Sequence, residues 1–304
     1  MMRSLYSGIS GLRVHQTRMD VIGANLANVN TVGFKCSRVT FRDVLYQSIS
    51  NPTTPQEDPP RGGTNPSQIG LGAQIGTIDV LMTRAGPMLT DKPTDIYLDG
   101  EGFFMVMDAA GNEYYTRVGD FRFDGFGRLV DGNGNFVMGL MGTRTEIDGE
   151  IPEEGATRSE LELVILNLAE AAGGMEIWAR LSQISIGPDG LITAYDSLSD
   201  DEDPVIIIGQ IAICKFTNPE AMSQEGSSYW IPTRNTGNED NNPRIFKPGL
   251  GGTGRTIANR LEMSNVELSK EFTDMIVTQR GFQANSRIIT VSDEMLQELV
   301  NLKR

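Results

Sequence analysis

Apolar residues recur every three or four positions near both ends of the chain, and this is the spacing of a helix face that packs against a partner. Polar residues fill the gaps in both series without changing the register. Each end therefore predicts a long helix that needs a partner surface. The stripes are Leu5, Ile9, Leu12, Met19, Ile22, Leu26 and Val29 at one end, and Leu268, Phe272, Met275, Phe282, Ile289, Leu296 and Leu299 at the other.

The first stripe predicts a helix over about residues 3–29, and the second predicts one that begins at Ser264 or Asn265 and runs almost to Arg304. Ser264 and Glu267 have the spacing of a capping box.

Three glycines, Gly8, Gly11 and Gly23, lie inside the first helix, where each costs up to ~1 kcal/mol relative to alanine. Packing must offset that cost. We expect these small residues to permit a close approach between helices.

The residues between the two helices are punctuated by Gly and Pro and predict an antiparallel β-rich domain. The fold class is thus α+β, with terminal helices that pair as a coiled coil and enclose the β-rich middle. We divide the chain into a helical domain of 1–34 and 260–304, an extended Pro/Gly-rich linker of 35–75, and a β domain of 76–259. The expected strands are 95–99, 103–107, 114–117, 121–123, 128–130, 136–139, 181–186, 191–194, 205–208 and 211–216.

Two stretches leave their secondary structure open. Phe41, Val44 and Leu45 have helical spacing, so a short second helix within 35–49 is an option. Residues 144–178 are first acidic and then apolar, and the pattern does not decide between a helix and strands.

Composition excludes several classes of function. The 304 residues carry a formal net charge of −14 and no cluster of Lys and Arg, which argues against nucleic acid as a partner. No stretch approaches the ~18 apolar residues of a membrane span, so we expect no membrane insertion. The N-terminus lacks a continuous apolar core and a cleavage site, which predicts a protein that is cytoplasmic or exported without a cleaved signal.

Several motifs resemble sites of chemistry but fit a structural explanation better. Residues 249–254 match G-x-G-x-x-G without a preceding strand, and 131–136 begin like a calcium loop but lack its Gly and Glu. We interpret them as a linker and a β-turn, and the acidic run 200–203 as a solvated loop. His15, the single histidine, is interpreted as a surface or interface residue, and Cys36 and Cys214 as free thiols, with one disulfide as the alternative. We predict no catalytic residue, metal or cofactor.

Segments near both ends carry a family resemblance. Residues 24–35, ANLANVNTVGFK, resemble the signature of bacterial flagellar rod and hook axial proteins, which normally begins with two asparagines where this chain has Ala24 and Asn25. Residues 261–283 are similar to the C-terminal signature of the same family. The signature positions are Asn25, Asn28, Thr31, Gly33, Phe34, Lys35, Gln279 and Arg280.

Within that family, residues 1–41, 62–79 and 296–304 look most like the short hook proteins of Gram-positive-type bacteria. The distal rod protein is the alternative, because it shares both ends and has an extended loop where 51–70 lies. The resemblance fails over about 146–180, where we expect a lineage-specific insertion.

The resemblance implies a structural role without enzymatic activity. The terminal helices would line an inner tube, and the β domain would form an outer tube of a hook that transmits motor torque to the filament as a flexible universal joint. The implied partners are other copies of the chain, the distal rod, hook-cap and hook–filament junction proteins, and the flagellar type III export apparatus. The protein would reach the cell exterior, in the hook and basal body, without a cleaved signal peptide.

Two other classes compete with this interpretation. An extracellular enzyme or glycan-binding module displayed on coiled-coil ends would show activity or ligand binding in the isolated fragment 76–255. A cytoplasmic coiled-coil scaffold would be separated from an appendage protein by cell fractionation.

Overall fold

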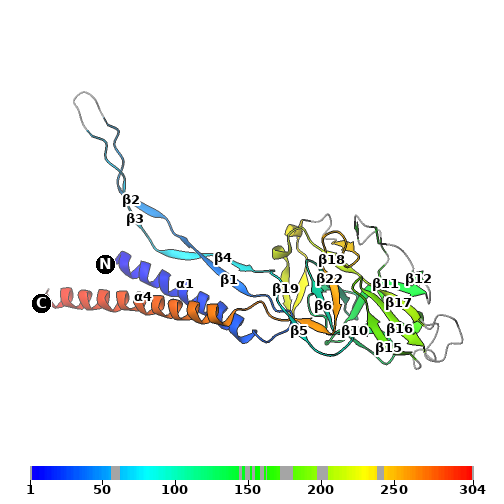
Figure 1. The fold of residues 1–304 in the computed structure, drawn as a ribbon. Coiled ribbons are helices and arrows are strands. Elements are labelled where there is room, and N and C mark those ends of the chain that lie inside the picture. Colours follow the sequence, from blue (N-terminus) through cyan, green and yellow to red (C-terminus); the bar gives the residue numbers. More distant parts are fainter. Residues whose placement is uncertain are drawn as a thin grey trace. The chain divides into compact units, whose positions relative to one another are not determined.

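The computed structural model divides the chain into two compact units (Figure 1). It describes residues 2–55, 62–143, 146–147, 151–152, 155–157, 161, 163–171, 181–196, 205–237 and 243–302. The helical unit comprises Met1–Val29, Cys36–Leu81 and Val266–Arg304, and the β unit comprises Asn30–Lys35 and Met82–Asn265.

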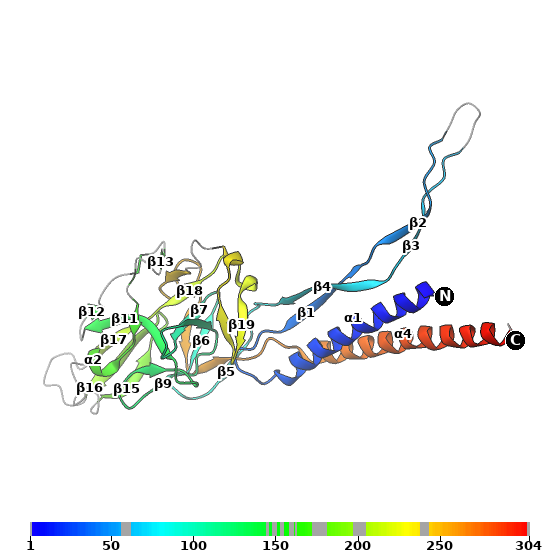
Figure 2. The same ribbon diagram turned by 180° about the vertical axis from the view of Figure 1, so that it is seen from behind.

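Two long helices, α1 (Met2–Ala27) and α4 (Leu268–Leu302), lie side by side in the helical unit, as Figures 1 and 2 show from opposite directions. Both helices are therefore confirmed. Among the described residues, neither has the length and apolarity needed to cross a bilayer.

The predicted start of the second helix is wrong, because α4 begins at Leu268. Asn265 does not cap it. The backbone N–H of Asn265 donates to the Phe34 carbonyl at 3.4 Å, and its side chain donates to Thr83 Oγ1 at 2.9 Å. These bonds hold Asn265 to other residues of the β unit, and the helix begins three residues later.

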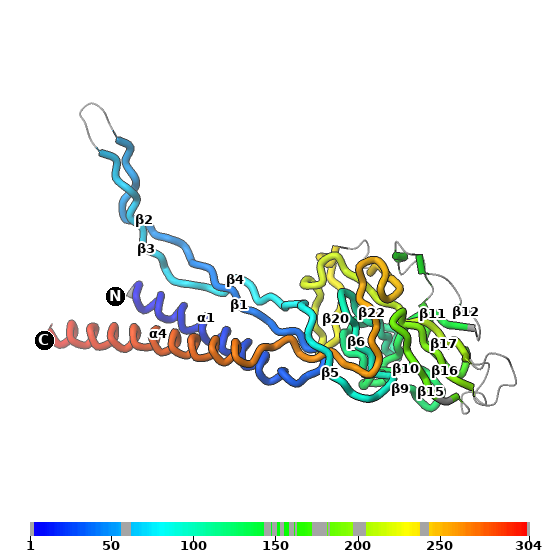
Figure 3. The backbone as a smooth tube through the Cα atoms, in the orientation of Figure 1, coloured from blue at the N-terminus to red at the C-terminus, as the bar shows by residue number. Residues whose placement is uncertain are grey.

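An antiparallel two-stranded ribbon completes the helical unit (Figure 3). β1 (Ser37–Asp43) pairs with β4 (Ala73–Val80), and β2 (Tyr46–Ser50) pairs with β3 (Ser67–Gly70). β1 and β4 pack on α1, whereas every residue of β2 and β3 is exposed. Residues 56–61, which belong to the Pro-rich stretch, lie outside the described part of the chain.

The option of a short helix within 35–49 is wrong, since this segment forms strands. Its helical spacing rested on Phe41, Val44 and Leu45, which span little more than one turn. Pairing along the ribbon outweighs so short a pattern, and it places Phe41 opposite Ile75.

The β unit is built from antiparallel strands, as the Gly and Pro punctuation predicted. Its largest sheet follows the order β13-β21-β18-β7-β11-β17-β16-β15. The strands are β5 (Pro87–Leu89), β6 (Ile96–Asp99), β7 (Phe103–Met107), β8 (Glu113–Thr116), β9 (Arg122–Phe123), β10 (Leu129–Val130), β11 (Phe136–Thr143), β12 (Glu146–Ile147), β13 (Ala156–Thr157), β14 (Val164–Ile165), β15 (Leu181–Ile186), β16 (Leu191–Asp196), β17 (Val205–Ile211), β18 (Ile213–Lys215), β19 (Ser223–Gly226), β20 (Tyr229–Ile231), β21 (Arg244–Phe246), β22 (Arg255–Ala258) and β23 (Arg260–Glu262).

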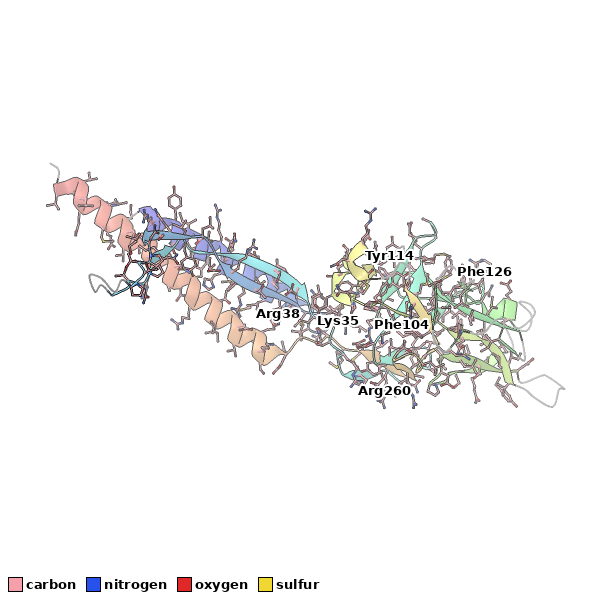
Figure 4. The ribbon with its side chains drawn as sticks, turned by 90° about the horizontal axis from the view of Figure 1, so that it is seen from above. Lys35, Arg38, Phe104, Tyr114, Phe126 and Arg260 are labelled. Atoms are coloured by element: carbon pink, nitrogen blue, oxygen red, sulfur yellow. The ribbon has the colours of Figure 1, made fainter. Side chains whose placement is uncertain are left out.

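Large apolar side chains from these strands form one continuous core in the β unit. Phe104 of β7 is fully buried and meets Phe121 edge to face, with ring centroids 5.2 Å apart. Figure 4 shows Phe104 inside the unit and Phe126 at its surface, where Phe126 is exposed. All residues of this core belong to the β unit. Its antiparallel sheets bury one face against the core and can leave the other face to solvent.

The undecided stretch 144–178 contains both kinds of element. Its described residues form the short strands β12, β13 and β14 and one helical turn, α2 (Leu168–Ala171). Two short 3₁₀ turns, η1 (Pro219–Ala221) and η2 (Arg234–Thr236), lie later in the β unit.

The motifs that we interpreted as structural occupy turns. The Asp131 carboxylate accepts the backbone N–H groups of Asn133 and Asn135, each at 2.9 Å, which closes a tight turn. Residues 249–254 connect β21 to β22 as a turn. The acidic run 200–203 lies outside the described residues. Both cysteines are buried free thiols.

Candidate assembly interface

α1 and α4 pack in antiparallel directions. Near one end of the pair the hydroxyl oxygens of Ser4 and Ser292 lie 3.4 Å apart. Near the other, Arg18 Nη2 donates to Asp274 Oδ1 at 2.9 Å. Both links are partly exposed, so they contribute little energy and mainly set the register. The pairing of the helices is thus established, whereas their winding as a coiled coil stays a prediction.

The contact between the helices is close because glycines lie in it. A Cβ added at Gly11 would lie 2.6 Å from Asn285 Nδ2, and one at Gly281 would lie 2.5 Å from the ring of His15. His15 is therefore an interface residue, and burial, followed by the charge of Arg18, lowers its pKa. The cost of glycine in a helix is offset here by the approach of the backbones.

The N-terminal stripe lies mostly beside this contact rather than in it. The residues of α1 that face α4 include Ser4, Gly8 and Gly11. Each of these three immediately precedes a residue of the predicted stripe. Of the predicted residues, Ile22 is buried, Ile9 is exposed, and Leu5, Leu12, Met19, Leu26 and Val29 are half-buried.

The C-terminal stripe is divided in the same way. In the described part of α4 the buried residues are Thr278 and Ser292, both small and polar. Of the predicted residues, Met275, Ile289 and Leu296 are half-buried, whereas Leu268, Phe272, Phe282 and Leu299 are exposed.

A second apolar face of α4 was largely missed by the sequence reasoning, which named only Leu299 of its residues. We call it the outer stripe: its side chains are exposed and follow one another at intervals of three, four or eleven residues. The apolar spacing of this face is visible in the sequence. The predicted heptad register included Phe272 and Phe282, and that register follows a different face of α4. The outer stripe consists of Val277, Ile288, Val291, Met295, Leu299 and Leu302.

Asn25 of the signature joins the helix to the ribbon. The Asn25 side chain is buried; its Nδ2 donates to the Ser37 carbonyl at 2.8 Å and its Oδ1 accepts the Ser37 N–H at 3.0 Å. It thereby pairs with β1 as another strand would. Asn28 Nδ2 donates to the Ala24 carbonyl at 2.9 Å near the end of α1.

Lys35, the last residue of the signature, is buried in an ionic cluster of the β unit. Its Nζ donates to Glu262 Oε1 at 2.6 Å and to the Thr83 carbonyl at 2.8 Å. The same Glu262 oxygen accepts the Ala85 N–H at 3.1 Å. Because both charged side chains are almost fully buried, this pair ties residues 30–35 firmly to β23.

Arg117 is the third charge of the cluster. Its Nη1 lies 3.6 Å from Glu262 Oε2, and its guanidinium carbon lies 5.2 Å from the centroid of the Phe103 ring. Burial lowers the pKa of Arg117, and the Glu262 carboxylate opposes that shift. Two buried cations therefore share one carboxylate.

The remaining signature residues have varied surroundings. Gly33 has a φ of +66°, and a Cβ there would lie 2.8 Å from the Val118 side chain, so glycine is required. Phe34 is half-buried and Thr31 is exposed. Gln279 and Arg280 are exposed on α4.

Three family models match this chain. The model described as "Flagella basal body rod protein" matches residues 5–35. "Flagellar hook protein FlgE/F/G D1 domain" matches 97–194, and "Flagellar basal body rod FlgEFG protein C-terminal" matches 257–302. The matches cover α1 with the signature loop, much of the β unit, and the segment from β22 through α4.

Full-length relatives agree with these matches. The flagellar basal-body rod protein FlgG of Bacillus subtilis is 42% identical over 304 residues, with both chains fully covered. The chain belongs to the flagellar hook and basal-body rod family. Two further members of this family come from Borreliella burgdorferi: the hook protein FlgE, 30% identical over 448 aligned residues, and the rod protein FlgG, 32% identical over 307, each covering both chains fully.

Rod and hook relatives of this flagellar chain differ in how they align with it. Every position of the alignment with the Bacillus rod protein is filled by a residue of this chain. The alignment with the Borreliella hook protein has 448 positions against 304 residues here, so at least 144 of them face a gap. The rod protein is thus the better match in both identity and length.

Family membership bears on the function of the paired helices and the β unit. The matched relatives are structural components of the flagellum rather than enzymes. The matched D1 domain includes residues 146–180, where we expected an insertion, and that expectation stays a prediction. Glu262 and Arg117 were missed from sequence, because nothing local distinguishes a buried charge from an exposed one.

Proposed function

We propose that this chain is a structural subunit of the flagellar rod, the drive shaft that was the alternative in our sequence analysis, rather than of the hook. The observation that carries the proposal is the 42% identity with the Bacillus rod protein over the whole of both chains. Hook relatives are less similar, at 30% identity or below among the two described by that name.

Polymerisation would proceed through the helical unit. The two helices pack against each other along a narrow contact that contains glycines, and other apolar side chains of both helices stay exposed. Burying each large apolar side chain against another copy would contribute ~1.5–3 kcal/mol. Coiled-coil contacts through the two predicted stripes, together with the outer stripe, would make a torsionally stiff inner tube.

The β units would form the outer layer of the shaft. Their core is complete, so they can fold before assembly and present a finished surface to neighbouring copies. The partners would be other copies of this chain and the adjoining axial proteins of rod and hook. Export through the flagellar type III apparatus without a cleaved signal peptide belongs to the same proposal.

Electron microscopy of intact flagella with an antibody against residues 82–265 tests the location. Label confined to the straight rod supports the proposal. Label along the curved segment outside the envelope would contradict the rod proposal and support the hook interpretation. Absence of label from every flagellar structure would contradict both the rod and the hook interpretations.

A variant tests the role of the helical unit. Phe272 is 50% exposed on α4, so Phe272→Asp should leave the single chain folded and abolish its polymerisation. Gln283→Asp places the same charge at an exposed polar position of α4 and is the matched control. Normal rods in a motile F272D strain would show that this face is not an assembly surface.

A further inference from the structure

A pocket of about 800 Å³ opens at one end of adjacent strands in the β unit. β7, β18 and β21 are hydrogen-bonded neighbours, and the pocket lies where β7 begins, β18 ends and β21 begins. Its charged lining residues are three cations, Arg117, Lys215 and Arg244, and one anion, Glu101. Neither the signature nor the helical stripes account for this positive site in a chain whose formal net charge is −14.

Arg117 is incompletely satisfied in the wall of this pocket. Its side chain is 5% exposed, and its Nε and Nη1 atoms are buried without a hydrogen-bond partner in the described structure. Glu262 Oε1 is bonded to Lys35 at 2.6 Å, and Glu262 Oε2 lies 3.6 Å from Arg117 Nη1, which is too far to satisfy either atom and leaves Arg117 Nε without an acceptor. A buried guanidinium with free donors is costly, so an additional anion beside it would be stabilising.

Lys215 and Arg244 add positive charge across the mouth of the pocket. They are direct partners in the register of β18 and β21, an arrangement of like charges that destabilises a sheet. Lys215 is paired with Glu101 at 3.0 Å, but that carboxylate is mostly exposed. Arg244 has no ion pair among the described residues. An unfavourable charge pair at the rim of a pocket is a feature of a binding site more than of a stable sheet.

Aromatic rings line the same cavity and give it an apolar wall. Phe103, Phe216 and Phe246 line the cavity beside the cations, and the Phe103 and Phe216 rings meet edge to face at 5.9 Å. Such a wall suits the aliphatic part of a peptide, whereas the cations suit its carboxylates. Fixed guanidinium groups bind carboxylates with two parallel hydrogen bonds.

We propose that this pocket binds an acidic peptide segment of a second copy of the chain. The identity of the partner rests on the proposed function, which supplies neighbouring copies, and on charge complementarity, because the chain holds 40 acidic residues against 26 basic ones. The densest acidic run is Asp200-Asp201-Glu202-Asp203. The contact would join β units to one another, separately from contacts between helices.

Calorimetry with the full-length chain, taken as the monomer fraction from gel filtration, tests the pocket directly. The probe is a capped peptide of residues 197–204, and the control peptide carries Asn and Gln in place of its four acidic residues. The acidic peptide should bind and the amide form should bind at least tenfold more weakly. Equal binding of the two peptides, or none by either, overturns the proposal.

Variants place the binding at the pocket. Arg244→Glu should weaken binding of the acidic peptide at least tenfold, whereas Arg260→Glu, which reverses another exposed strand arginine of the β unit, should not change it (Figure 4 labels Arg260). Binding that is insensitive to R244E would overturn the site.

Polymerisation assays separate this proposal from the proposed function. If R244E slows polymerisation at low salt and R260E does not, the partner is a second copy. If R244E polymerises normally while F272D does not, the assembly function stands and the proposed partner is overturned. If the antibody finds no chain in the rod or hook, the proposed function falls and the second copy is rejected as partner with it, whatever the peptide result.

Discussion

The β unit buries most of its large apolar side chains within itself, whereas the helical unit leaves many of its own in contact with solvent. Phe104, Leu129 and Ile213 of the β unit are fully buried. In the described part of α4 the buried positions are held by Thr278 and Ser292, and Phe272 and Leu302 are 50% and 82% exposed. Two units of one chain thus differ in whether a core is completed by the single molecule.

The difference corresponds to two kinds of stability. An antiparallel sheet that closes over its own core needs no second molecule, and its free energy of folding is a property of one chain. A helix pair with apolar faces on its outside gains stability when further copies bind to those faces, and the gain grows with the logarithm of their concentration. The stability of the helical unit should therefore depend on protein concentration, and that of the β unit should not.

The largest expected effect comes from the buried ionic cluster of the β unit. Glu262→Ala would leave Lys35 and Arg117 buried without their shared carboxylate, and breaking such a pair costs about 3–5 kcal/mol. Denaturant unfolding followed by fluorescence of buried Trp230, in a Trp178→Phe background, measures the loss. Glu267→Ala, at an exposed position, is the control. An unchanged midpoint in E262A would mean that the cluster does not hold the signature loop in place.

We expect the outer stripe to be required for polymerisation but not for the stability of the single chain. Met295→Asp places a charge on this exposed face, which would forfeit ~1.5–3 kcal/mol per copy in the polymer. Sedimentation should therefore show monomers, and the unfolding midpoint of the β unit should not move. Asn301→Asp adds the same charge at an exposed polar position of α4. If M295D and N301D polymerise alike, the outer stripe faces solvent in the rod.

Periodicity predicted both long helices and ten of the 23 strands in the described residues, because both patterns are local. Phe103–Met107 was predicted with its observed bounds, and α1 ends within two residues of expectation. The ribbon was harder to predict: β2 and β3 are exposed throughout, and the pairing of β1 with β4 joins residues up to about 40 positions apart.

The candidate interface could be predicted only in part. Heptad spacing identified both helices as partners but not the face that α1 uses, because its close contacts are made at Gly8, which faces Ile289, and at Gly11, which faces Asn285. Hydrophobicity is a poor guide where glycine permits close packing. Arg117 and Glu262 were beyond sequence reasoning, because their burial depends on how distant strands come together.

Two glycines of α1 sharpen the comparison within the helical unit. A Cβ at Gly11 would meet Asn285 at 2.6 Å, whereas a Cβ at Gly23 would meet nothing within 4 Å. Gly11→Ala gains helix propensity but must displace the Asn285 side chain, so an overpacking cost of about 1–3 kcal/mol should leave the helix pair no more stable than the wild type. Gly23→Ala should stabilise α1 by up to ~1 kcal/mol. Helicity by circular dichroism during thermal unfolding measures both, and equal effects of the two variants would contradict the close contact.

The smallest effect concerns a hydroxyl of the β unit and depends on pH. The phenol of Tyr229 donates to Asp131 Oδ2 and accepts from Asn133 Nδ2 at 2.7 Å. Burial, reinforced by the Asp131 carboxylate, raises the pKa of Tyr229 to about 12 from its ordinary value of 10.0. Because the folded state favours the neutral phenol, its contribution to stability is complete below pH 10 and is lost as the pH rises to about 12.

Absorbance titration at 295 nm of the wild-type chain and Tyr229→Phe isolates this group among the seven tyrosines. The difference curve should have its midpoint near 12, and the stability advantage of the wild type over Y229F should narrow across the same interval. A midpoint near 10 would mean that the phenol is solvated and that the turn at Asp131 is open. In that case the β unit would leave side chains near Asp131 open to solvent, as the helical unit does. The contrast between the two units would then hold only for the apolar core of the β unit.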